Sequence, residues 1–155
     1  MNTISKLLIA TLFVFSAVQA KAQKNVFEAQ TFSDQHEAEI ALTNETKYLI
    51  FTGNKDASEQ VRVAFAEQNL EDLSDKGILY VADVSAMPSF ITKMFALPKM
   101  RDYPFKMAVI MDEEQIKDWP KQEEKITAIR LENLHVQSLE YLDTAQDVSS
   151  WLAQP

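Results

Sequence analysis

Residues 77–113, GILYVADVSAMPSFITKMFALPKMRDYPFKMAVIMDE, decide the fold that we expect for this chain. The run at 78–84 is apolar without alternation, which is typical of a parallel strand buried on both faces. A second apolar run, at 105–111, follows a turn at 101–104 that contains a proline. An apolar helical segment separates the two runs, so the stretch predicts strand, helix, turn and strand.

The helix expected inside this stretch is apolar around much of its circumference, mainly at residues 90–97. We expect Ser85 to cap its start and Pro98 to end it, because proline interrupts the backbone hydrogen bonds of a helix. Apolar residues at helical spacing favour a place in the core. The alternative is a binding surface within residues 87–111, since methionine side chains adapt to varied partners.

Upstream of this stretch, residues 47–52 (KYLIFT) form a short apolar run that predicts a buried strand. Asp56 and Glu59 follow at the spacing of a capping box, so we expect a helix to begin near Asp56. We expect that helix to end at 74–77, which includes one of only two glycines in the chain. It would then cross over to the parallel strand at 78–84.

Alternation of apolar and polar residues predicts two β-hairpins, and capping-box spacing predicts a last helix. The hairpins pair residues 26–32 with 37–42 and residues 125–131 with 135–142, and the cap consists of Thr144 and Asp147. The element order predicts an α/β fold over residues 21–155, a mixed β-sheet flanked by helices with an N-terminal β-hairpin. No repeat or linker in the sequence divides this single domain.

The first twenty residues have the composition of a signal peptide. Lys6 precedes LLIATLFVFSAV, an apolar run that is too short to span a bilayer. Small residues offer cleavage after Ala20 or Ala22. We therefore expect export to the periplasm without membrane insertion; a membrane anchor is the alternative, and full secretion stays open.

Composition excludes several kinds of chemistry. The chain has 23 acidic and 15 basic residues, so nucleic-acid binding is not expected. It has no cysteine, so thiol catalysis and thiolate metal sites are not expected. Two glycines cannot form a phosphate-binding loop. His36 and His135 lack the spacing of a metal site, so we expect no metal, no resident cofactor and no catalytic residue.

Three short segments resemble the thioredoxin-like superfamily, in particular its redoxin and peroxiredoxin branches. They are TFSDQHEAEIAL before KYLIFT, YVADVS at 80–85, and MRDYPFKMAVIMDE at 100–113. The resemblance implies a cis bond between Tyr103 and Pro104. It also implies that the family's redox cysteines would fall at 53–59, where this chain reads GNKDASE.

The resemblance without the thiols implies an exported, redox-inactive domain that binds a peptide or protein in the cell envelope. Its groove would be lined by Lys55, Asp56, Asp102, Tyr103 and Pro104. One alternative is an oxidoreductase that holds a flavin or glutathione beside Tyr103 and Pro104. Another is a structural subunit of an envelope complex, docked through residues 90–97. The sequence leaves the oligomeric state open.

Overall fold

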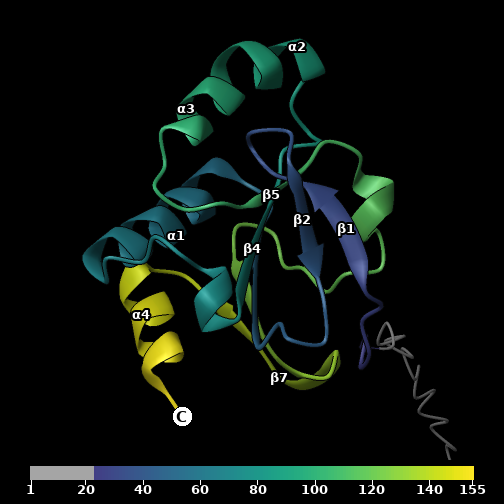
Figure 1. Ribbon diagram of the computed structural model, residues 1–155, viewed down its shortest axis with the longest axis vertical. Helices are drawn as coiled ribbons and strands as arrows, with labels where there is room; N and C mark the ends of the chain where they lie inside the picture. Colours follow the sequence, from purple (N-terminus) through teal and green to yellow (C-terminus); the bar gives the residue numbers. More distant parts are fainter. Residues whose placement is uncertain (1–22) are drawn as a thin grey trace, which may run out of the picture.

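The structure, a computed structural model, describes residues 23–155. The expected signal peptide and both of its cleavage positions lie outside the described residues. The centre of the fold is a five-stranded sheet with the order β5-β4-β3-β6-β7 (Figure 1). Its strands are β3 (Tyr48–Thr52), β4 (Ile78–Asp83), β5 (Ala108–Ile110), β6 (Ile126–Glu132) and β7 (His135–Leu142).

The sheet is mixed, as the sequence predicts. Strand β3 pairs in parallel with β4, which pairs in parallel with the short edge strand β5. On its other side β3 pairs antiparallel with β6, and β6 forms a hairpin with β7. The first five residues of β4 are buried, which explains its unbroken apolar run, because both faces of a central strand are covered.

The N-terminal hairpin is a separate two-stranded sheet of β1 (Gln30–Ser33) and β2 (Glu39–Leu42). Its turn is held by the Asp34 carboxylate, which accepts from the backbone N–H groups of His36 and Ala38. The first strand is shorter than predicted because the chain before it pairs elsewhere. Val26 forms a bridge with His135, and Phe27 is buried.

Helix α1 (Lys55–Glu67) crosses from β3 to β4 as expected, but its predicted cap is wrong and so is its predicted end at 74–77. Residues there form a separate short helix, η1 (Ser74–Lys76). Asn54 is the N-cap of α1, and its side-chain oxygen accepts from the backbone N–H of Ala57 at 2.8 Å. An amide side chain in that place satisfies the first turn without Asp56. Glu59 instead binds Arg62, with 2.9 Å between Nε of Arg62 and a carboxylate oxygen.

The apolar segment after β4 forms one helical run of three pieces, α2 (Ser89–Ile91), the π-helical turn η2 (Thr92–Ala96) and α3 (Leu97–Arg101). The prediction that Pro98 ends the helix is wrong. Pro98 lies in the first turn of α3, where a missing N–H disrupts least. Ser85 does not cap the run, because its N–H and hydroxyl both bind Asp83.

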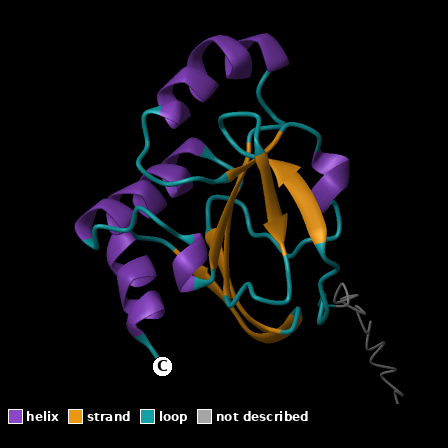
Figure 2. Ribbon diagram, in the orientation of Figure 1, coloured by secondary structure: helices purple, strands orange, loops and turns teal. Residues whose placement is uncertain are grey.

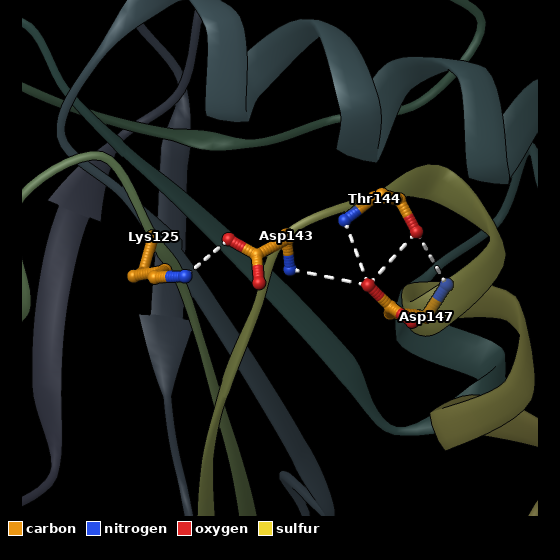
Figure 3. A network of polar contacts seen from close by, with 4 residues as sticks. All are labelled: Lys125, Asp143, Thr144 and Asp147. Atoms are coloured by element: carbon orange, nitrogen blue, oxygen red, sulfur yellow. Dashed lines mark hydrogen bonds and ion pairs between the residues drawn. The ribbon is translucent and has the colours of Figure 1, made fainter.

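Helices α1 and α4 (Ala145–Ala153) cover one face of the sheet, and the N-terminal hairpin covers the other face (Figure 2). The capping box predicted for α4 is confirmed. The Thr144 hydroxyl and the Asp147 carboxylate each bind the other residue's backbone N–H, at 3.1 and 3.0 Å. Figure 3 shows this box, and an ion pair between Lys125 and Asp143 that ties the start of β6 to the same turn.

The bond between Tyr103 and Pro104 is trans, so the predicted cis bond is wrong. The turn at Pro104 leads into β5, which joins the sheet edge in parallel with β4. The strand that pairs antiparallel with β3 is β6, which begins at Ile126. Pro104 therefore precedes an edge strand, and the bond before it has the trans form that most X–Pro bonds adopt. Within residues 23–155, no helix is long and apolar enough to cross a membrane.

Candidate functional site

The start of α1 lies where the resemblance places redox cysteines, and a chain of hydroxyl groups occupies it. The Tyr80 hydroxyl and the Thr52 hydroxyl are 2.9 Å apart, and Thr52 is 2.9 Å from the Ser58 hydroxyl. Ser58 also donates to the carbonyl oxygen of Asn54 at 2.8 Å. Tyr80 and Thr52 are buried. The chain therefore ties α1 to β3 and β4, and the sequence analysis did not anticipate it.

Burial raises the pKa of the Tyr80 hydroxyl, although its hydrogen bonds with Ser58 and Thr52 act in the opposite direction. A raised pKa in the folded state leaves stability unchanged below the pKa of an unfolded tyrosine, about 10. Above it, the unfolded chain loses a proton that the folded chain keeps. Above that pH, the free energy of unfolding of wild type should fall with pH more steeply than that of Tyr80→Phe. The difference between the two slopes should be at most about 1.4 kcal/mol per pH unit.

Urea unfolding at intervals from pH 8 to pH 11 checks this expectation. Tyr141→Phe, which alters a half-buried tyrosine of β7, is the matched control and should keep the wild-type slope. Equal slopes for wild type and Tyr80→Phe would contradict the linkage.

A second polar group lies on the outer side of α1 and involves Tyr103. The hydrogen bond from Arg62 lowers the pKa of Glu59, and the charges of Lys99 and Lys55 add to that effect. Burial raises the pKa of Tyr103, and the negative charge of Glu59 raises it further. Tyr103 also packs against the core cluster that includes Val61 and Phe65 of α1, so the turn after α3 lies against that helix.

The five residues expected to line a groove come from two segments, the first turn of α1 and the turn after α3. Lys55 and Asp56 are exposed in the first turn of α1, beyond the end of β3. Asp102 is the exposed C-cap of α3, and Tyr103 stacks on Phe105 with 5.5 Å between ring centroids. Pro104 is exposed and shares a hollow with residues at the start of β4. Tyr103 packs against the core cluster that contains Val61 of α1, whereas Pro104 lines that hollow.

The segment from Met87 to Leu97, which contains α2 and η2, presents large apolar side chains to solvent. Their exposed fractions are 61% for Phe90, 65% for Met94 and 64% for Phe95, and Met87 is 38% exposed. We call these four residues the apolar helix patch. Only Thr92 and Leu97 of this run are buried. Helical spacing favoured a core position for these residues, and that prediction is wrong for the four residues of the patch. The structure places them on the surface, as in the alternative.

The segment that carries the patch is basic. Lys93, Lys99 and Arg101 are its charged residues, and no acidic residue occurs between Asp83 and Asp102. The rest of the chain carries an acidic excess, since the formal net charge of the whole is −8. Figure 1 shows the α2–α3 run projecting from the end of the domain, beyond the body of the sheet. The patch is thus an apolar surface with cationic neighbours on an acidic protein.

Two open hollows stand out on the described part of the chain. The first, of about 570 Å³, is lined among others by three residues of β2 (Glu39, Ile40, Ala41), by Gly77, and by the first two residues of β4 (Ile78, Leu79). We call it the edge slot. The second, of about 600 Å³, lies between residues 117–121 and β7.

No set of three histidine or carboxylate side chains within residues 23–155 gathers closely enough to hold a metal ion. His36 lies in the turn of the N-terminal hairpin, and His135 begins β7 with its Nδ1 atom 3.0 Å from the carbonyl oxygen of Asn133.

Comparisons with known proteins identify the architecture. No family model matches the sequence, and no curated protein matches it either. Among solved structures, StoA from Bacillus subtilis superposes with a TM-score of 0.55 at 11% identity, over 83% of this chain and 98% of that one. Peroxidoxin BcpB from Mycobacterium tuberculosis gives 0.54 at 10% identity, over 84% and 96%. The thioredoxin domain of a thiol-disulfide oxidoreductase from Bacteroides vulgatus gives 0.51 at 14%, over 86% and 99%.

The chain has a thioredoxin-like fold. Likeness at this level of identity shows the architecture alone, and the residues decide what the domain can do. This thioredoxin-like domain has no cysteine anywhere in its sequence. Asn54 and Ser58 cap and anchor α1 where the resemblance places the redox pair, so the scaffold is kept and thiol exchange is impossible.

Proposed function

We propose that this protein is an exported, redox-inactive thioredoxin-like domain that binds a protein partner in the cell envelope. The observation that carries the proposal is the apolar helix patch. Phe90, Met94 and Phe95 each expose more than three-fifths of their surface. Three such side chains on one helical run are costly to leave in water unless they meet a partner.

The π-helical turn supports this proposal because it lies within the segment that carries the exposed side chains. In a π-helix, residues four and five positions apart lie above one another. Phe90 precedes Met94 and Phe95 by those spacings, and the turn spans Thr92–Ala96. Pi-helical turns often occur at functional sites. Aromatic side chains and methionine are enriched at the centre of protein interfaces.

The partner that fits is a protein with an apolar groove and an acidic rim. Lys93 and Lys99 flank the patch without a neighbouring carboxylate in the segment, so a partner carrying acidic residues would be electrostatically complementary. The expected groove at Lys55, Asp56, Asp102, Tyr103 and Pro104 has support only in part. Tyr103 continues the patch segment toward α1 and can extend the same surface.

A double variant tests the patch. Phe90→Ser with Phe95→Ser should leave the free energy of unfolding nearly unchanged, because both rings already face solvent. The probe is a helical peptide with a leucine stripe flanked by glutamates, titrated by calorimetry. Loss of two aromatic contacts at the centre of an interface should weaken binding by about thirtyfold.

Val26→Ser is the matched control, because Val26 is an exposed apolar residue outside the patch; it should bind the peptide as wild type does. A lysine-flanked version of the peptide should bind less tightly than the glutamate version. The proposal fails if wild type binds neither peptide, or if the control variant weakens binding equally. It also fails if vesicles of anionic lipid bind the patch more tightly than the peptide does, since the occupant would then be a membrane.

A further inference from the structure

The edge slot is bordered by strand edges rather than strand faces. Consecutive residues of a strand point to opposite faces of its sheet. Yet the consecutive residues Glu39, Ile40 and Ala41 of β2 all line the slot, and so do Gly77, Ile78 and Leu79 across it. A hollow that touches consecutive residues must face the edge of the strand, where the backbone N–H and C=O groups point.

The outer edge of β2 has backbone groups that pair with no other strand. Within residues 23–155, β2 pairs with β1 on one side and with no strand on the other. Across the slot the start of β4 is already bonded, because the N–H groups of Gly77 and Ile78 donate to carbonyl oxygens of residues 73–74. The unpaired edge of β2 is a template for an added strand. The slot therefore offers backbone hydrogen bonds to an extended chain.

The charged residues that line the edge slot favour one kind of polypeptide. The carboxylates that line the slot are those of Glu39, Glu45, Glu71 and Asp72, and Lys106 is the only cation among its lining residues. Asp72 is bound by the Ser74 hydroxyl at 2.8 Å, which leaves three acidic side chains without a hydrogen bond to another side chain. An acidic groove favours a ligand with lysine or arginine side chains.

We propose that the edge slot binds an extended, basic polypeptide segment, which adds as a strand to the edge of β2. This site lies apart from the apolar helix patch and does not depend on the function proposed for that patch. A second copy of this chain is a poorer occupant. Pairing β2 with its own copy would bring Glu39 toward another acidic edge, and like charges across strands are destabilising.

The test uses full-length mature protein and an eight-residue peptide of alternating lysine and valine. Calorimetry gives the affinity, and the amide NMR signals of Glu39–Leu42 report where the peptide pairs. The same peptide with alternate backbone nitrogens methylated keeps its charge but loses half of its pairing groups. We expect methylation to abolish measurable binding, and Glu39→Lys or Glu71→Lys to weaken it by about tenfold each.

Glu140→Lys is the matched control, because Glu140 is an exposed glutamate of β7 outside the slot; it should change the affinity less than twofold. Equal binding of the methylated peptide would overturn the proposal, since charge attraction alone would then account for the complex. Amide shifts outside β2 and the start of β4 would overturn it as well. So would a wild-type protein that binds no lysine–valine peptide, or one that dimerises through β2 instead.

Discussion

Replacing Trp119 with alanine should lower the free energy of unfolding by about 4 kcal/mol, the largest loss that we expect from a single substitution. The indole is 6% exposed and lies at the centre of an aromatic cluster. Its ring meets those of Phe27, Phe32 and Phe51 edge to face, with 5.2, 6.0 and 5.8 Å between centroids. Removing it leaves a cavity and deletes three favourable aromatic contacts at once.

Urea unfolding of the protein measures this loss. Trp119→Phe should recover more than half of it, because a smaller ring keeps part of the cluster filled. The second tryptophan, Trp151, is left in place and reports unfolding by its fluorescence. A loss below about 1 kcal/mol for Trp119→Ala would show that the hairpin is not packed on the sheet through this ring.

The second large effect is expected at Gln35, which joins the N-terminal hairpin to the chain before β5. Its side chain is fully buried. The amide nitrogen donates to the carbonyl oxygen of Phe105 at 2.7 Å, and the amide oxygen accepts from the N–H of Met107 at 3.0 Å. Gln35→Leu keeps the volume but leaves two buried backbone groups without partners. The expected cost is about 3 kcal/mol, because each orphaned group costs roughly 1–3 kcal/mol.

Chemical denaturation again gives the magnitude, and hydrogen exchange gives the mechanism. The amide proton of Met107 should exchange much faster in Gln35→Leu than in wild type, because its acceptor is gone. Gln137→Leu, at an exposed position of β7, should change stability by less than about 0.5 kcal/mol. Unchanged protection at Met107 would mean that the backbone finds another acceptor.

Elements whose signals are local were predicted well. The apolar runs that became β3 and β4 are short, dense and bounded by turns, and the cap of α4 uses two residues three positions apart. Their order, together with the resemblance, was enough to predict the thioredoxin-like fold. The cap of α1 was misassigned because Asn54 and Asp56 both have cap-forming side chains, and only the backbone path decides which one serves.

The candidate sites were harder to predict, because they depend on which helices and strands pack together in the folded domain. A helical run that is apolar all round does not say which side faces solvent, so Phe90 and Phe95 could not be told apart from core residues. Pro98 did not end its helix, because a π-helical turn before it changed the register. The groove expected at Tyr103 and Pro104 came from the resemblance, and no pattern in the sequence itself shows how that turn lies relative to the start of α1.

By itself the sequence determined the class of fold, the strand and helix order, and the loss of thiol chemistry, because periodicity and composition are properties of neighbouring residues. Only the tertiary structure decided which apolar side chains stay exposed, that Gln35 and Trp119 join the hairpin to the rest of the domain, and where an unpaired strand edge faces a hollow. The physical reason is distance along the chain. These features depend on residues that lie tens of positions apart, and no local pattern records such contacts.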